Sequence, residues 1–143
     1  MSELLEKARS YEAKKIAATD KESKPLFHIS APAGWINDPN GFSVYNGKIH
    51  LFYQYYPYLR EWGPMHWGHS TTSDMIKWEQ LPCVMAPDEE YDIKGCFSGS
   101  AIEADGKHVL VYTGVTRIKL PDGSEQERQN QCIAFGDGLN YVK

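Results

Sequence analysis

Long hydrophobic runs are missing from this sequence of 143 residues. Its longest uninterrupted apolar stretch is about four residues, at Val109–Tyr112, whereas a transmembrane helix needs about 20. The N-terminus, MSELLEKARS, is charged where a signal peptide would carry an apolar segment. We therefore expect a soluble chain with no export signal and no membrane partner.

A concentration of positive charge is also missing. The chain holds 15 Lys and Arg residues against 19 Asp and Glu residues, a net charge of −4. No segment gathers Lys and Arg in the way that binding to a phosphate backbone requires. Nucleic acid is therefore not an expected partner.

Cysteine is scarce, and Cys83, Cys96 and Cys132 match no zinc-binding or thioredoxin spacing. An odd number of cysteines cannot pair completely within one chain. Free thiols in a reducing cytoplasm fit best, and we expect no metal and no other cofactor.

The overall composition is that of a globular protein, with 41% hydrophobic and 24% charged residues, 12 Gly and 8 Pro. The length suits one domain or one piece of a larger fold. Residues 1–24 differ from the rest, since they contain six basic and five acidic residues among helix formers. We predict one amphipathic helix at about 3–18, with Leu4, Leu5, Ala8, Tyr11 and Ile16 near helical spacing and no catalytic role.

From residue 25 onward the pattern is typical of an all-β protein, with short runs of β-branched and aromatic residues between turn signals. Two-residue hairpin turns are predicted at Asn46-Gly47 and Asp105-Gly106, and a further reversal at Pro121-Asp122-Gly123. The predicted strands are Gly41–Tyr45, Lys48–Tyr55, His66–Thr72, Trp78–Gln80, Phe97–Glu103, His108–Thr113 and Asn130–Phe135.

Periodicity alone leaves a sandwich, a barrel and propeller blades open. A weak internal repeat favours blades, because residues 42–55 and 97–113 both combine a strand, an Asn-Gly or Asp-Gly turn and a second strand. Two such units of roughly 55 residues match two four-stranded blades. Residues 141–143 are then placed in the outer part of the second blade.

Aromatic residues are concentrated between Phe27 and Trp78, which holds 12 of the 18 and all four tryptophans. Aromatic faces pack in a core or stack on sugar rings, and taken alone the density favours a core. Residues 48–57 alternate with period two and place Gln54 among aromatic side chains. This amide needs partners, which backbone groups or sugar hydroxyls could supply.

The segment Trp35-Ile36-Asn37-Asp38-Pro39-Asn40-Gly41 has two interpretations. The simpler one is a type I turn with Asp38 first, Pro39 second and Gly41 fourth. The functional one is a rigid turn that holds the Asp38 carboxylate still at the start of the next strand, as a nucleophile or base requires. The segment by itself does not decide between them.

Two other patterns suggest chemistry that we reject. His66 and His69 are three residues apart on a predicted strand, which sends the two rings to opposite faces, so packing or hydrogen bonding is expected rather than a metal site. Ser98 has no evident His and Asp relay, which argues against a serine-hydrolase triad. The small residues after Phe97 would instead allow close approach to the backbone.

An ordered set of motifs resembles the N-terminal part of glycoside hydrolase family 32, the family of invertases, sucrose-6-phosphate hydrolases and fructan hydrolases. The motifs are WINDPNG (35–41), LFYQYYP (51–57), W-x₃-HWGHS (62–70), D-x₃-W (74–78), FSGSA (97–101), YTG (112–114) and residues 129–132. The match covers about residues 25–143, and the charged N-terminal helix is similar to that of bacterial intracellular members.

The resemblance implies a five-bladed β-propeller with its active site on the central axis, of which residues 25–143 would form blades 1 and 2. It implies a retaining hydrolase of terminal β-fructofuranosyl units and a small carbohydrate substrate. Transferred by motif, Asp38 is the nucleophile, and the fructose subsite is lined by Asn37, Gln54, Trp62, Phe97 and Ser98. One position departs from the family, which commonly has Asn where Tyr56 stands.

A retaining glycosidase needs a second carboxylate, about 5–5.5 Å from the first, to donate and accept a proton. In this family that residue is a Glu before a Cys, and an Arg-Asp-Pro motif steadies the transition state. The sequence contains neither motif. We therefore expect an N-terminal fragment or short gene product that is inactive alone.

Two alternatives remain for the function: an inverting propeller glycosidase of the arabinan or xylan type, and a non-catalytic module that binds a sugar or another partner. The residues do not distinguish sucrose, sucrose 6-phosphate and fructans, and show no Lys, Arg or His cluster for a phosphate. They do not indicate an oligomeric state.

Overall fold

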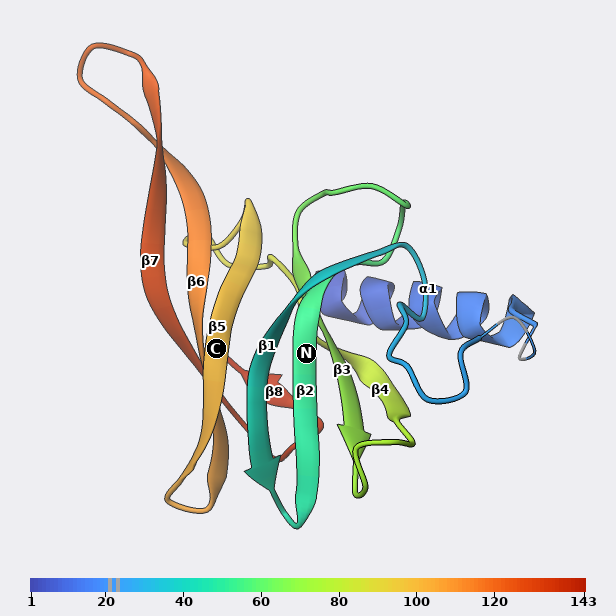
Figure 1. Ribbon diagram of the computed structural model, residues 1–143. Helices are drawn as coiled ribbons and strands as arrows, with labels where there is room; N and C mark the ends of the chain where they lie inside the picture. Colours follow the sequence, from blue (N-terminus) through green and yellow to red (C-terminus); the bar gives the residue numbers. More distant parts are fainter. Residues whose placement is uncertain (21, 23) are drawn as a thin grey trace.

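The computed structural model, which describes residues 1–20, 22 and 24–143, contains one helix and two four-stranded antiparallel sheets (Figure 1). In both sheets the spatial order of the strands follows the chain order, as in successive propeller blades. The helix is α1 (Glu3–Ala18). Sheet A holds β1 (Trp35–Tyr45), β2 (Lys48–Tyr56), β3 (His66–Thr72) and β4 (Glu79–Met85). Sheet B holds β5 (Gly95–Ala104), β6 (Lys107–Lys119), β7 (Glu125–Gly136) and β8 (Tyr141–Val142).

Helix α1 has the predicted bounds and lies beside β4 of sheet A (Figure 1). It begins at Ser2, whose hydroxyl accepts a hydrogen bond from the Leu5 N–H at 3.2 Å. The buried side of the helix consists of Leu5, Ala8 and Glu12. Leu4 and Ile16, which were predicted on the packed face, are about two-fifths exposed, so that part of the prediction is wrong.

The hairpin turns are confirmed. In both Asn46-Gly47 and Asp105-Gly106, the first residue has a φ of +49° and the glycine a φ of +72°. These are the left-handed values that a type I′ turn requires. The reversal at Pro121-Asp122-Gly123 is closed by a 2.9 Å hydrogen bond from the Gly123 N–H to the Leu120 carbonyl. It connects β6 to β7, the long hairpin that projects from the molecule in Figure 1.

The bounds of several strands differ from the prediction. The turn predicted at Asp38–Gly41 is wrong, because these residues belong to β1, and Pro39 and Asn40 pair with β2. Strands β4, β6 and β7 extend well beyond the predicted Trp78–Gln80, His108–Thr113 and Asn130–Phe135. The expected outer strand of the second sheet is present as β8, which pairs with β7.

Both faces of sheet A carry a buried core, because the side chains of β2 alternate between the two sides. Phe52 packs between the sheets with Trp67 and Leu110, whereas Tyr53 and Tyr55 pack beneath α1 with Leu5 and Ala8. Strand β1 lies against β5, so the two sheets meet along their first strands (Figure 1). This junction positions the site described below.

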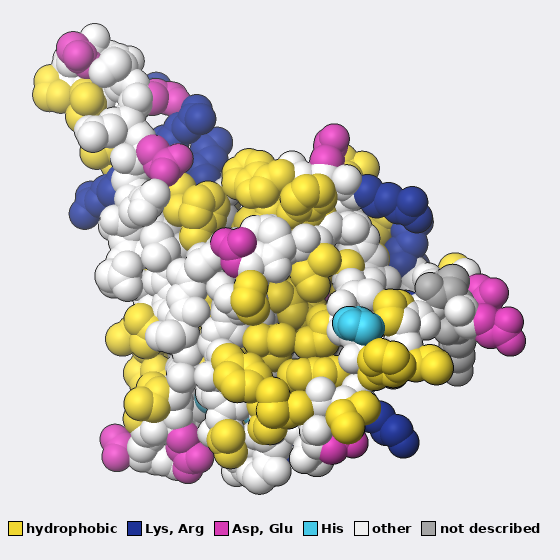
Figure 2. All heavy atoms as spheres, in the orientation of Figure 1, with side chains coloured by type: hydrophobic (Ala, Val, Ile, Leu, Met, Phe, Trp, Pro, Cys, Tyr) yellow, Lys and Arg dark blue, Asp and Glu magenta, His cyan; other side chains and the backbone are white. Residues whose placement is uncertain are grey.

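Other hydrophobic side chains lie at the surface. Phe42 and Val44 on β1 are 58% and 64% exposed, and Ile102, Ile133 and Phe135 extend an exposed apolar set over sheet B. Figure 2 shows a broad hydrophobic area in front of sheet A, with charged side chains mainly around its edge. Within the described ranges, no helix has both the length and the apolar character needed to cross a membrane.

Candidate active site

The pairing of β1 with β2 is interrupted at two points. The first interruption determines where the side chains of Asn37 and Asp38 lie. Ile36 pairs with Tyr55 and Pro39 with Tyr53, so both Asn37 and Asp38 stand opposite the single β2 residue Gln54. One extra residue in a strand is a β-bulge, which bends the strand and redirects its side chains. Asn37 and Asp38 are exposed as a result, while Gln54 is buried.

A β-bulge in β5 of sheet B brings Ser98 next to Asp38. Phe97 pairs with Thr113 and Gly99 with Tyr112, so Ser98 is the extra residue of β5. Its hydroxyl donates a hydrogen bond to Asp38 Oδ2 at 3.1 Å. The residues of this contact are 60 positions apart in the chain, and both are exposed to solvent. An incoming ligand therefore has access to the carboxylate.

Three hydrogen bonds hold the backbone just before Ser98, two from side chains of sheet A and one to Met65, the residue before β3. The Cys96 N–H donates to the Met65 carbonyl at 2.8 Å. Gln54 Nε2 donates to the Cys96 carbonyl at 2.9 Å, and Trp67 Nε1 donates to the Phe97 carbonyl at 3.1 Å. Because Gln54 and Trp67 are buried, these contacts hold the start of β5 against sheet A. Of the two kinds of partner left open for Gln54, a backbone carbonyl is thus present.

Aromatic side chains flank the two residues next to this contact, Phe97 before Ser98 and Trp35 beside Asn37. The rings of Trp62 and Phe97 are nearly perpendicular, with centroids 6.2 Å apart, and Trp62 is 58% exposed. Trp35 Nε1 donates to Asn37 Oδ1 at 2.9 Å, which orients that amide. All six residues predicted for the site therefore lie where the two sheets meet: Asn37, Asp38, Gln54, Trp62, Phe97 and Ser98.

Tyr56, the residue that departs from the family motif, supports the loop of residues 57–65 that carries Trp62. A Cβ atom added to Gly63 would come within 2.5 Å of the Tyr56 ring, so the loop backbone lies directly against that ring. The ring also contacts those of Tyr58 and His66. Tyr56 thus acts on the site through packing of this loop.

The two histidines of β3 have the structural roles expected of them. His66 Nδ1 lies 2.9 Å from the Pro64 carbonyl at the end of the 57–65 loop. His69 Nε2 lies 2.9 Å from His50 Nδ1, and its ring stacks on Phe52. Burial lowers the pKa of His66 from 6.5 to about 4, so its ring is neutral at neutral pH.

Sequence reasoning missed Trp67 as part of this assembly. The residue was visible in the motif, but its partner, the Phe97 carbonyl, is 30 residues away in the other sheet. Only the contact between sheets reveals it. The assembled groups are an accessible carboxylate, a hydroxyl, amides and aromatic edges, a set that can hold a polyol ring beside a nucleophile.

Comparison with known proteins gives a consistent assignment. The profile of the "Glycosyl hydrolases family 32 N-terminal domain" matches residues 28–143. The chain is 46% identical to a sucrose-6-phosphate hydrolase of Escherichia coli over 83% of its own length and 25% of that protein. It is 48% identical to a levanase of Bacillus subtilis over 98% of its length and 21% of that protein.

Among solved structures, a family 32 β-fructofuranosidase of Bombyx mori superposes with a TM-score of 0.82 at 44% identity, covering 96% of this chain and 28% of that one. The sucrose-6-phosphate hydrolase of Lactobacillus gasseri superposes with a TM-score of 0.76 at 35% identity, covering 94% and 27%. The chain thus spans about a quarter of the length of these relatives.

Proposed function

This chain belongs to glycosyl hydrolase family 32, and on that premise we propose that it is the nucleophile-bearing part of an enzyme that releases terminal β-fructofuranosyl units. The substrates are sucrose, sucrose 6-phosphate or short fructans. Residues 25–143 form the first two blades of its catalytic propeller, and residues 3–18 a structural helix. The observation that carries the proposal is the hydrogen bond from Ser98 to Asp38 across the two sheets.

In the proposed reaction an Asp38 carboxylate oxygen attacks the anomeric carbon of the fructosyl unit. The new C–O bond forms as the bond to the leaving group breaks, and the electron pair departs with the leaving group. Asn37, Gln54 and Ser98 hold the sugar hydroxyls, while Trp62 and Phe97 border the ring. The hydrogen bond of Ser98 with Asp38 supports this assignment, because it fixes the carboxylate beside the Ser98 hydroxyl.

The general acid lies outside residues 1–143 in this proposal, since the sequence contains no Glu-Cys pair. Further blades would cover the exposed apolar residues Phe42 and Val44 of β1 and Ile133 and Phe135 of β7. A cytoplasmic location is supported by the three cysteines, all of which are free.

A donor whose leaving group needs no proton tests the nucleophile without the acid. We would incubate the 143-residue protein with β-fructofuranosyl fluoride, from which fluoride leaves as the anion. The expected product is an ester between the fructosyl unit and Asp38. It should accumulate, because the base that activates water for the second step is absent. Peptide mass spectrometry locates the modified residue.

Two variants complete the experiment. Asp38→Asn should remain unlabelled, whereas Asp74→Asn should be labelled like the wild type, because Asp74 only caps a turn through the Ile76 and Lys77 N–H groups. Labelling that survives Asp38→Asn would refute the assigned nucleophile. Release of free fructose with no ester on any residue would favour an inverting reaction instead.

A further inference from the structure

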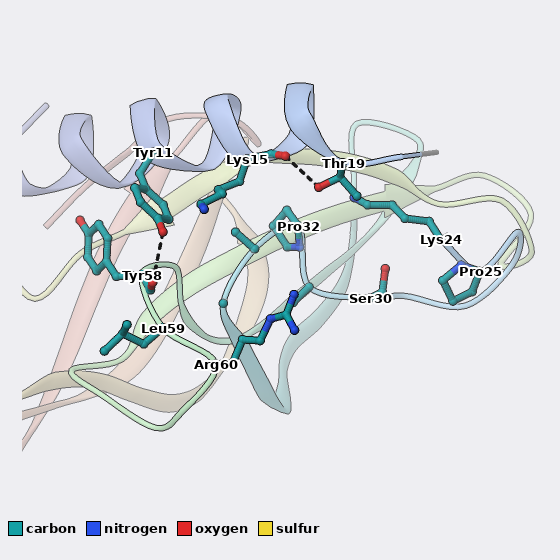
Figure 3. Close-up of a pocket in the computed structure, with 13 residues that line it drawn as sticks. Tyr11, Lys15, Thr19, Lys24, Pro25, Ser30, Pro32, Tyr58, Leu59 and Arg60 are labelled. Atoms are coloured by element: carbon teal, nitrogen blue, oxygen red, sulfur yellow. Dashed lines mark hydrogen bonds between the residues drawn. The ribbon is translucent and has the colours of Figure 1, made fainter. Parts of the chain in front are cut away.

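A groove of about 360 Å³ lies beside the 57–65 loop (Figure 3). Its walls are the last turns of α1, the segment 24–34 and residues 58–60 of the loop. Tyr11, Lys15 and Thr19 line it from α1 at intervals of four residues, which places them on one side of the helix. We call this hollow the α1 groove.

Three cationic side chains from separate parts of the chain meet at the α1 groove: Lys15, Lys24 and Arg60. Figure 3 shows the side chains of Lys15 and Arg60 approaching the space beside Pro32 from opposite walls. Among the described residues, no Asp or Glu lines the groove. The whole chain has a net charge of −4, so a local excess of positive charge is not a consequence of composition.

Structural roles account for only part of this charge. Lys15 is in the last turn of α1, where a cation interacts favourably with the helix dipole, but Lys24 and Arg60 do not belong to the helix. Within the described part of the chain, none of the three forms an ion pair. Lys24 acts electrostatically on Glu12, whose pKa is raised to about 7 by burial, so that carboxyl neutralises little of the charge below pH 7.

The other walls suit a small polyol. Tyr11 and Tyr58 contact each other edge to face, with ring centroids 5.2 Å apart, and the Tyr11 hydroxyl donates to the Tyr58 carbonyl. Pro25 and Pro32 make parts of the wall stiff, and the hydroxyl of Ser30 lies at the lining. The groove is larger than a phosphate group, which leaves room for the molecule that carries it.

We propose that the α1 groove binds a phosphate monoester of a small sugar, with Lys15, Lys24 and Arg60 around the phosphate group. A phosphate monoester carries about two negative charges and three acceptor oxygens, and a guanidinium group can donate two parallel hydrogen bonds to it. The site is separate from Asp38 and goes beyond the proposed hydrolysis. It would make the protein responsive to phosphorylated sugar without using the nucleophile.

Isothermal titration calorimetry of the 143-residue protein with glucose 6-phosphate, inorganic phosphate and glucose tests the proposal. Glucose 6-phosphate should bind most tightly, inorganic phosphate more weakly and glucose not at all. Binding should strengthen between about pH 5.5 and 7.5, because the second phosphate proton dissociates near pH 6. Lys15→Gln and Arg60→Gln should each weaken binding about three- to fivefold.

Lys14→Gln is the matched control, since Lys14 is the neighbouring exposed cation of α1 and does not line the groove. It should leave the affinity unchanged. The proposal is overturned if Lys14→Gln weakens binding as much as Lys15→Gln, or if glucose binds as tightly as glucose 6-phosphate. Asp38→Asn should retain full affinity, so a failure of the hydrolase assignment is distinguishable from a failure of this site. Loss of binding in Asp38→Asn would place the phosphate elsewhere and contradict the proposal.

Discussion

Both faces of sheet A carry a buried core, and each core encloses ionisable groups. The face beneath α1 encloses one carboxyl group, Glu12, beside Tyr53 and Tyr55. The face against sheet B encloses the imidazoles of His50, His69 and His108. Burial disfavours the charged form of each group, so it raises the pKa of a carboxyl group and lowers the pKa of an imidazole. Ionisation of Glu12 should therefore weaken one interface at alkaline pH, and protonation of His108 should weaken the other at acid pH.

The face against sheet B also has the larger aromatic core, and Phe52→Ala should have the largest effect of the changes considered. Phe52 is completely buried, and its ring stacks on His69 at 4.3 Å and contacts Trp67 and His108. Removing such a ring costs about 3–5 kcal/mol of unfolding free energy. Urea unfolding followed by tryptophan fluorescence measures it. A loss below about 1 kcal/mol would show that the two sheets do not share this core.

Acid should weaken the interface between the sheets through His108. Burial lowers the pKa of His108 from 6.5 to about 4, and its ring nitrogens contact the Ser43 and Tyr141 hydroxyls. The unfolded state thus binds the proton more readily, and stability is lost as pH falls from 6.5 through 4, by roughly 3 kcal/mol. The pKa values of His50 and His69 are also lowered by burial, which adds to the effect.

The measurement is the free energy of unfolding between pH 4 and 7 for the wild type and His108→Gln. The variant loses two hydrogen bonds at every pH, so its overall stability is lower. Its decline over this range should nevertheless be shallower, because one titrating group is gone. Parallel curves for the two proteins would exclude His108 as a source of acid sensitivity.

Alkaline conditions should weaken the interface with α1 through Glu12. Burial raises the pKa of Glu12 from 4.5 to about 7, although its Oε2 accepts a hydrogen bond from the Cys83 N–H at 3.0 Å. The folded state holds the proton more tightly, so the stability it contributes is present below pH 4.5 and lost as pH rises through 7. Glu12→Gln should gain about 2 kcal/mol at pH 8 and little at pH 5.

Gln retains an acceptor for the Cys83 N–H, but its amide N–H₂ needs a partner of its own, which limits the gain. Thermal melts of the wild type and Glu12→Gln at pH 5 and pH 8 provide the comparison. Glu6→Gln, at an exposed position of the same helix, is the control and should show no such pH-dependent difference. An equal shift at both pH values would mean that Glu12 does not titrate in this range.

A substitution on the outer face of sheet B should have the smallest effect on the free energy of unfolding. Phe135 is 49% exposed there, with the Lys107 ammonium 5.7 Å from its ring centroid. Phe135→Ala should change the unfolding free energy of the 143-residue protein by less than about 1 kcal/mol, because the residue loses little buried area. The same urea titration used for Phe52→Ala measures it. Equal losses for the two variants would remove the distinction between a covered and an uncovered face.

Local rules predicted much of the fold. Asn46-Gly47 and Asp105-Gly106 form the expected turns because few other residues adopt positive φ at both positions. The turn expected at Asp38-Pro39-Asn40-Gly41 failed for a physical reason, since pairing with β2 outweighs the local preference. Gly41 keeps a turn-like φ of +52°, but it does so within the second bulge of β1.

The candidate site was predictable only as far as the motifs reach. The motifs identified Asp38 and Ser98 as site residues. They did not predict the hydrogen bond between the two, which depends on two bulges in different sheets. The α1 groove was beyond prediction, because Lys15, Lys24 and Arg60 are scattered along the chain. The burial of Glu12 was equally unpredictable, since a charged residue on an amphipathic helix is expected to face solvent.

The central claim is that contact between the two sheets places Asp38 for attack, and the labelling rate of Asp38 in Trp67→Phe tests it directly. This variant removes the N–H that holds the Phe97 carbonyl, next to Ser98. At a temperature where the variant is folded, fructosyl fluoride should label Asp38 about tenfold more slowly than in the wild type, because the groups around the carboxylate shift. Trp78→Phe, at the residue just before β4 of the same sheet, should label at the wild-type rate. Folded Trp67→Phe protein that is labelled as fast as the wild type would contradict the claim.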